Sequence, residues 1–287
     1  MPLPPFAAAH FTHPEAVDWA RRASTNGGTI STTVLRAVSD FCAAIDAASI
    51  RSAMCRVNLF CGGNLSGCLV PLYVSTSLGG SVLGNSTDTN VNFVSADFQE
   101  TRVSGGLKGN GTSKYLNTGF TPALFASTDS VHLSYSATSL ETAHTNNPCA
   151  IGTYDGTDPT LYDLSVSFNI LGGNSRCARL STQSASGIVR VSAITRGSTE
   201  SHLIGTRTAS NAAALYGAGV SLATSTTSVT SGTSTRPFYV FAENSTGTTT
   251  AFTSGRLRMY SIGSGLTATQ ADAFSAAVAA FNTALGR

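Results

Sequence analysis

The chain has 287 residues, of which 41% are hydrophobic, so it can bury a sizeable core and global disorder is excluded. Only 11% of the residues are charged, against about 25% in typical soluble domains, whereas Ser and Thr make up about a quarter of the chain. The net charge of +2 is not gathered into any Lys/Arg cluster, so the sequence predicts no nucleic acid partner. No run of about 18 apolar residues occurs, and we therefore expect no membrane span.

The first ten residues lack the basic and apolar regions of a secretory signal, so we expect synthesis and folding in a cytoplasm. The six cysteines match no common zinc spacing and form no Cys-x-x-Cys. Buried free thiols are therefore favoured over a metal site, and disulfides formed after release from the cell stay open as an alternative. The cysteines stand at positions 42, 55, 61, 68, 149 and 177.

Residues 1–70 differ in pattern from the rest of the chain. Thr12 and Glu15 have the spacing of a capping box, and Pro14 suits the first turn of a helix. This region has too few apolar residues to fold alone, so we expect it to dock on the remainder of the protein, with Trp19 as a docking residue. The pattern predicts helices over 16–22, 31–45 and 49–54 and a strand or strand entry over 57–61.

Beyond residue 88 the sequence is dominated by short segments of β-forming residues separated by turn signals. Residues 164–170 alternate strictly between apolar and polar side chains, as a strand does when one face is buried. Many short strands with regular breaks favour a sandwich or jelly roll, and the lack of alternating long helices excludes a parallel α/β sheet. Strands are predicted over 91–94, 115–120, 131–135, 161–170, 188–194, 237–241 and 256–260.

The last element is an amphipathic helix. Thr267 and Gln270 have the spacing of a capping box, and an apolar stripe follows on one face. The fold prediction is therefore mainly β: a jelly-roll sandwich with an N-terminal helical cap and a C-terminal helix packed on it. We divide the chain into a cap or attachment region over 1–70, a sandwich over 71–265 and a helix over 266–287. The stripe consists of Phe274, Val278, Phe281 and Leu285.

Three stretches resemble those of known proteins. Residues 88–94 followed by 106–120 resemble the opening of concanavalin A-like jelly rolls in bacteriophage structural proteins, and 255–263 with the final helix resembles the close of such domains. Residues 19–62 resemble the leader that precedes this jelly roll in tail-associated phage proteins. The resemblance implies a virion protein of a tailed bacteriophage with a lectin-like or glucanase-like fold. It carries over no functional residue, because no catalytic motif defines the family.

Signatures of catalysis are missing from the sequence. Glycoside hydrolysis usually needs two carboxyl groups across the scissile bond, and in the laminarinase-like branch they lie in a Glu-x-Asp-x-Glu pattern that does not occur here. Asp155, Asp158 and Asp163 are spaced by three and five residues, which does not keep them on one face of a strand. The five histidines show no local partner pattern, and there is no Gly-x-Ser-x-Gly elbow. We therefore expect no enzymatic activity and no cofactor.

The best candidates for ligand binding lie around the acidic turn. Tyr154 and Tyr162 supply aromatic faces on which a sugar ring can stack, and Asp155 and Asp158 supply hydrogen-bond acceptors. The same carboxylates could hold Ca²⁺, although solvated turn residues explain them as well. Half-buried tyrosines are also ordinary on strands, so the structural interpretation stays open.

These observations together predict a structural virion protein of a tailed phage, made in the host cytoplasm and then part of the particle. A tail fibre or baseplate component with a possible role in binding host-surface carbohydrate is the first interpretation. Its partners would be other virion proteins and further copies of itself, because phage particles are symmetric. A capsid decoration protein and a polysaccharide depolymerase or glycosidase are the alternatives.

Overall fold

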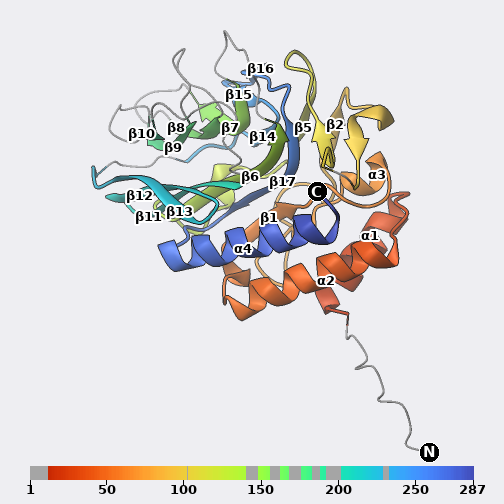
Figure 1. Ribbon diagram of the computed structural model, residues 1–287. Helices are drawn as coiled ribbons and strands as arrows, with labels where there is room; N and C mark the ends of the chain where they lie inside the picture. The colour runs from red at the N-terminus through yellow and green to blue at the C-terminus, as the bar shows by residue number, and fades with distance from the viewer. Residues whose placement is uncertain are drawn as a thin grey trace, which may run out of the picture.

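The computed structural model describes residues 12–101, 103–139, 148–155, 162–167, 176–182, 188–191, 202–228 and 233–287. Two β-sheets lie face to face, and a layer of helices covers the outer side of one of them (Figure 1). The fold is thus mainly β and of sandwich type, with a C-terminal helix, as the sequence predicts. None of the described helices is long and apolar enough to cross a membrane.

Sheet A lies between the second sheet and the helices. Its path is, in spatial order, β13 (Val220–Ser225), β12 (Ala212–Gly217), β11 (His202–Ala209), β6 (Val131–Ser139), β17 (Arg256–Gly263), β4 (Gly106–Lys108) and β3 (Phe98–Gln99). Off this path, β1 (Met54–Asn58) pairs antiparallel with β17. All eight residues of β17 are buried, because this strand has neighbours on both edges and packing on both faces.

Sheet B forms the other half of the sandwich. Its path is β10 (Ile188–Val191), β9 (Arg176–Thr182), β8 (Tyr162–Ser167), β7 (Cys149–Asp155), β14 (Tyr239–Val240), β5 (Tyr115–Asn117) and β2 (Thr89–Val91). Beside it, β15 (Glu243–Ser245) runs parallel to β7 and pairs with β16 (Thr248–Thr250). The 3-10 turns η1 (Arg51–Ala53), η2 (Ser95–Asp97) and η3 (Pro122–Leu124) connect these elements.

Two hydrophobic cores hold the layers together. The first lies between the sheets and includes Leu116, Ile151, Val240 and Leu257. The second joins the outer face of sheet A to the helices, and in it Phe41 makes edge contacts with Phe274 and Phe281. The central strands of sheet A are therefore buried on both faces, and each core depends on this sheet for one of its walls.

The helical layer forms where the capping and apolar patterns favour it. The helices are α1 (Pro14–Thr25), α2 (Thr32–Ala47), the short α3 (Leu65–Cys68) and α4 (Ala268–Ala284). The side chain of Ser31 caps α2, and Thr267 and Gln270 form the expected capping box of α4. Trp19 is 1% exposed and its indole N–H donates to the Val70 carbonyl oxygen at 3.0 Å, which confirms its docking role.

Some local predictions were wrong. The N-cap of α1 is His13 rather than Thr12, and its imidazole accepts the Glu15 backbone N–H at 3.3 Å in place of the expected capping box. The segment predicted as a third helix is only the single turn η1, since it enters a strand at once. That strand, β1, begins three residues earlier than the predicted one. Because β1 pairs with β17, the N-terminal region also contributes a strand to sheet A.

Candidate functional site

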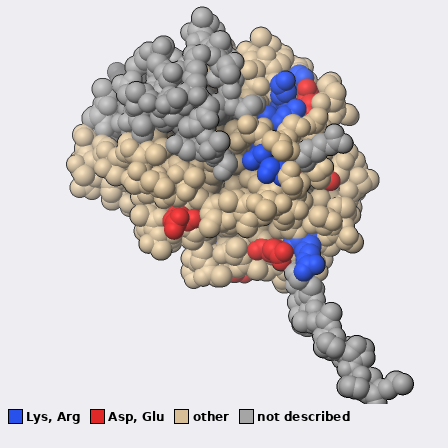
Figure 2. Space-filling model, in the orientation of Figure 1, with Lys and Arg blue, Asp and Glu red and all other residues tan. Residues whose placement is uncertain are grey.

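Only one of the two sheets presents an outer face free of the described helices. The outer face of sheet A packs beneath α4 and α2, whereas the described helices lie on the far side of the sandwich from sheet B (Figure 1). In the part of the chain that the structure describes, the outer face of sheet B is therefore a surface that a ligand can reach without displacing a helix. Figure 2 shows one side of the molecule, on which charged side chains are few and lie between wide uncharged areas.

Three aromatic rings gather on strands β5 and β14 and just after β16. The Tyr115 and Tyr239 rings lie 4.6 Å apart between centroids with an angle of 34° between their planes, and Phe252 meets Tyr115 edge-on at 6.3 Å. All three side chains are half-buried, whereas their strand neighbours Leu116 and Val240 are fully buried in the first core. Strand alternation therefore places the tyrosines on the outer face of sheet B.

The electrostatics of the tyrosine pair follow from this position. Partial burial raises the pKa of Tyr239, and the hydrogen bond with the neighbouring Tyr115 hydroxyl raises it further, while the Arg236 guanidinium opposes the rise. The Tyr239 phenol is therefore protonated at neutral pH, and the pair offers aromatic rings with hydroxyl groups at their tips. Such an arrangement suits a ligand with both an apolar face and hydroxyl groups.

The register of sheet B relates this cluster to Tyr154. Tyr239 pairs with Asn117 on one side and with Gly152 on the other. Tyr154 stands two residues beyond Gly152, so its side chain is on the same face as Tyr239 at a diagonal position. Tyr154 is half-buried. The predicted residue Tyr154 is thus on the aromatic surface, although Tyr115 and Tyr239 are its principal members.

A polar cluster lies at the end of β7. The Asp155 carboxylate is 3.3 Å from the Nε atom of Arg236, and it accepts a hydrogen bond from the Ser234 hydroxyl at 3.0 Å. The Ser234 hydroxyl oxygen in turn accepts the Arg236 backbone N–H at 3.1 Å. The side chains of Arg236 and Asp155 are 32% and 18% exposed, so solvent reaches both charges. The Arg236 Nε atom beside the carboxylate is itself enclosed, so the cluster is a partly exposed ion pair at the end of β7.

Of the other two predicted site residues, the structure describes one in part and the other not at all. Tyr162 begins β8 and pairs with Asp155, while its side chain is outside the described residues, as is the whole of Asp158. To bind Ca²⁺, the Asp155 carboxylate would have to give up its contact with the Arg236 guanidinium. The described part of the acidic turn therefore fits an ion pair better than a calcium site.

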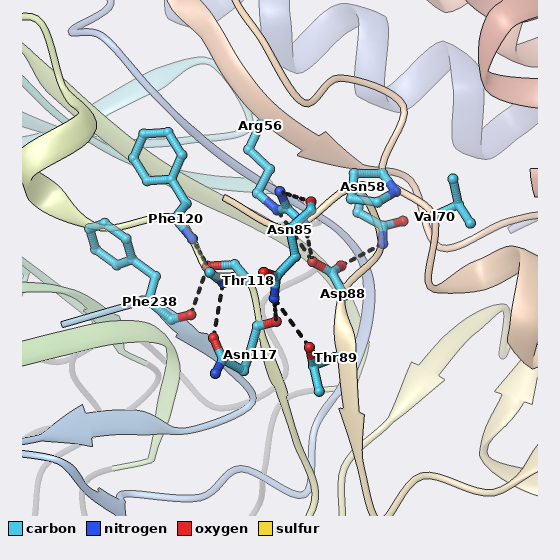
Figure 3. A network of polar contacts seen from close by, with 12 residues as sticks. Arg56, Asn58, Val70, Asn85, Asp88, Thr89, Asn117, Thr118, Phe120 and Phe238 are labelled. Atoms are coloured by element: carbon cyan, nitrogen blue, oxygen red, sulfur yellow. Dashed lines mark hydrogen bonds and ion pairs between the residues drawn. The ribbon is translucent and has the colours of Figure 1, made fainter. Parts of the chain in front are cut away.

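A fully buried polar network among the described residues joins Arg56, Asp88 and Asn58 (Figure 3). The Tyr260 hydroxyl donates to the same Asp88 carboxylate. Arg56 and Asp88 are 2.6 Å apart with both side chains at 0% exposure. Burial alone would lower the pKa of Arg56, but the adjacent Tyr260 and Asp88 raise it above its usual value. The network links β1 and β17 to the approach to β2. Because solvent does not reach these groups, the network does not bind a ligand.

A second closed network joins α4 to sheet A. His132 and His202 lie on its outer face, 0% and 1% exposed, so both rings face away from the other sheet and lie beneath a helix. The His132 Nδ1–H donates to the Ser264 carbonyl oxygen at 2.6 Å, and Nε2 lies 2.9 Å from the Ser261 hydroxyl. Burial lowers the pKa of His132 to about 4 and that of His202 to about 3. Both rings are therefore neutral at physiological pH.

The histidine network is continuous. The Ser261 and Ser134 hydroxyls are 2.6 Å apart, and Ser134 lies 3.1 Å from Nε2 of His202. Nδ1 of His202 meets the Ser275 hydroxyl on α4 at 3.1 Å. No described carboxylate contacts either ring, and solvent is excluded, so the arrangement is structural and not that of a nucleophilic triad.

A cluster with metal-ligand chemistry lies at the start of α1. The ligand atoms of His13, Glu15 and Cys42 are within 4.8 Å of one another. Both Glu15 carboxylate oxygens, however, accept from Nε of Arg51 at 2.7 and 2.9 Å, and burial raises the pKa of the Cys42 thiol to about 12. A metal ion needs the thiolate and would meet the guanidinium, so these residues do not fit a metal site.

A groove of about 530 Å³ opens beside this cluster. Its lining includes Pro14, Asp46 and Leu78. The ionisable side chains in it contact one another: Nε2 of His13 lies 2.9 Å from an Asp46 carboxylate oxygen, and Arg51 pairs with Glu15. Arg51 also lies 3.8 Å above the centre of the Tyr73 ring. These contacts hold α1 against η1, and each ionisable side chain among the described lining residues already has a partner.

The geometry defines the chain as a mainly β protein of sandwich type. No protein-family model matches it, and no curated protein matches its sequence. Among solved structures it is similar to a mutant of Trypanosoma rangeli sialidase displaying trans-sialidase activity, with a TM-score of 0.50 and 13% identity over 90% of this chain and 37% of that one. At this identity the likeness concerns the fold, and the chain spans about 37% of the sialidase's length.

Two further structures show the same kind of similarity. One is domain 4 of AbnA, an arabinanase from Geobacillus stearothermophilus in complex with arabinotriose, with a TM-score of 0.40 and 15% identity over 66% of this chain and 88% of that one. The other is the binding domain of botulinum neurotoxin DC in complex with SialylT, with a TM-score of 0.37 and 10% identity over 57% of this chain and 39% of that one.

Proposed function

We propose that this protein is a non-enzymatic carbohydrate-binding module and that the outer face of sheet B is its binding surface. The observation that carries the proposal is the half-buried pair Tyr115 and Tyr239, at 4.6 Å, on the sheet face that no described helix covers. Aromatic faces stack on the apolar side of sugar rings, and flanking polar groups fix the hydroxyls.

The setting we propose is the particle of a tailed bacteriophage, in which several copies form part of a tail fibre or baseplate and contact host-surface glycan. Support for this setting comes from the sequence resemblance and from the charge-poor, hydroxyl-rich composition. Detection of the protein in purified particles by mass spectrometry supports the proposal. Its absence from them contradicts a virion role, and localisation on the head would make it a decoration protein.

The binding proposal is tested by titrating the purified full chain with soluble polysaccharides in a calorimeter. Tyr239→Ala should weaken binding by about two- to tenfold, the equivalent of the roughly 0.5–1.5 kcal/mol of an aromatic contact. Tyr239→Phe is the matched control, because it keeps the ring and removes only the hydroxyl. Equal affinities for the wild-type protein and both variants would place binding elsewhere. Release of reducing ends from the polysaccharide would instead establish a depolymerase.

A further inference from the structure

We propose that the outer face of sheet B binds the interior of an extended polysaccharide chain, which lies along a diagonal row of three tyrosines and is oriented by the amide of Asn117. The row consists of Tyr115 on β5, Tyr239 on β14 and Tyr154 on β7. The inference rests on the proposed function and names the kind of ligand: several linked sugar units that are bound by the middle of the chain and not by its end.

The strand register fixes the direction of the row. Strands β5, β14 and β7 are successive neighbours in sheet B, and β14 is antiparallel to both of the others, so β5 and β7 run in the same direction (Figure 1). Asn117 and Gly152 stand level with Tyr239 on either side. Tyr115 comes two residues before Asn117, whereas Tyr154 comes two residues after Gly152. The two outer tyrosines are therefore displaced to opposite sides of Tyr239, and the three lie on one diagonal line.

The length of the row exceeds that of one sugar. Diagonal neighbours on adjacent strands are about 7–8 Å apart, so the row extends over about 15 Å from Tyr115 to Tyr154. The rings of Tyr115 and Tyr239, with centroids 4.6 Å apart and planes at 34°, form a continuous aromatic area in one half of it. All three tyrosines are half-buried, so each exposes part of its side chain to a ligand. A single sugar ring covers part of this row, and a chain of linked rings contacts the whole of it.

The described part of this face forms an open strip. Gly152, beside Tyr239, adds no side chain to the face. At the other side, Phe252 continues the aromatic surface beyond Tyr115, which it meets edge-on at 6.3 Å. The groove of about 530 Å³ described above lies beside α1 and not on this face. Recognition of a small group such as a chain end usually needs a concave pocket, so an open aromatic strip suits the interior of a chain.

Asn117 supplies a hydrogen-bond donor beside the row. It is half-buried and stands directly opposite Tyr239, so the two side chains are neighbours on the same face. Its Oδ1 atom accepts the Gly119 backbone N–H at 2.9 Å, and its carbonyl oxygen accepts from Nδ2 of Asn85 at 3.2 Å, which holds the residue in place (Figure 3). No described residue accepts a hydrogen bond from Nδ2 of Asn117. Its two N–H groups are therefore available to the oxygen atoms of a sugar stacked on Tyr239.

The test titrates the full chain in a calorimeter with fragments of two, four and six sugar units from each soluble polysaccharide that it binds, beginning with a β-1,4-glucan. Affinity should rise by about tenfold or more from two units to six, and reduction of the sugar at the chain end should leave it unchanged. Tyr154→Ala should weaken binding of the six-unit fragment by about two- to tenfold and leave the two-unit fragment unaffected. Tyr154→Phe is the matched control, because it keeps the ring.

Asn117→Asp tests the donor, because it keeps the acceptor for the Gly119 N–H and removes the two N–H groups. It should weaken binding of every fragment by about two- to tenfold, the equivalent of one hydrogen bond. Wild-type affinity for Asn117→Asp would exclude this residue from the site.

Affinity that does not increase beyond two units overturns the inference, as does a loss of binding when the chain end is reduced or a Tyr154→Ala variant with wild-type affinity for six units. The length series on the wild-type protein decides the matter even if Tyr154→Ala does not fold. In each of these cases Tyr239→Ala still weakens binding, and the proposed function stands. If no polysaccharide binds, or if Tyr239→Ala has no effect, the proposed function fails and the inference with it.

Discussion

The buried histidines make the protein sensitive to acid in a way that can be calculated. In the unfolded chain an imidazole has a pKa of about 6.5, whereas in the folded protein burial lowers the pKa of His132 to about 4 and of His202 to about 3. The neutral rings are therefore the form that folds. Their contribution is fully present above pH 6.5 and is lost as the pH falls toward the folded values.

The size of the loss follows from about 1.4 kcal/mol for each pH unit and each ring. Between pH 7.5 and pH 5 each histidine should cost about 2 kcal/mol, so the free energy of unfolding should fall by about 4 kcal/mol. By pH 3 the loss approaches about 8 kcal/mol, comparable to the whole stability of an ordinary domain. Since His202 contacts Ser275 on α4, we expect the helical layer to lose its hold on sheet A in this range.

Urea unfolding at a series of pH values measures this loss directly, with the double variant His132→Gln/His202→Gln as the control, because its amides can bond but do not titrate. The wild-type curve should fall by about 4 kcal/mol more than that of the double variant between pH 7.5 and 5. A difference below about 1 kcal/mol, with unchanged m-values, would refute the assignment of buried neutral rings. Each single variant should show about half of the effect.

Three further outcomes depend on groups that the fold buries. Asp88→Asn leaves a fully buried guanidinium without its charge partner and should lower the free energy of unfolding by about 3–5 kcal/mol, measured by urea titration. The thiols of Cys42 and Cys61, whose pKa values burial raises to about 12, should resist a disulfide reagent at pH 8 until the protein is unfolded, and rapid labelling in the native state would contradict their burial. Gly263→Ala would bring a methyl group to 1.9 Å from the Ala53 carbonyl oxygen and should cost at least about 1–3 kcal/mol, visible as a lower Tm.

Much of the fold was predictable because the sandwich strands alternate and the helices carry caps. The C-terminal helix is the clearest case: Thr267 and Gln270 form its capping box, and Phe274 is buried on the predicted face. Strand β1 was misplaced because all five of its residues are buried, with Cys55 in one core and Val57 in the other. A strand between two cores does not alternate between apolar and polar side chains in its sequence. The charged Arg56 makes this buried strand still harder to recognise.

The binding surface was predictable only in part, for a similar reason. Tyr154 and Asp155 stand next to a turn signal in the sequence, and this signal led to their prediction as ligand-binding residues. Tyr115 and Tyr239 lie far apart in the chain, and only the strand register brings them together. Arg236 gave no sequence signal, since its relation to Asp155 depends on two segments that meet at the rim of the sheet.

The position of β17 also determines when the protein can fold. This strand pairs with β1, β4 and β6, and its pairing with β1 spans about two hundred residues of intervening chain. A ribosome releases the N-terminal segments long before residues 256–263 appear, so sheet A cannot close, and α1 and α2 have no complete surface to pack on, until β17 has been made. Folding of sheet A is therefore a non-local event, and the apolar faces of α1 and α2 lack their partner surface until β17 is available.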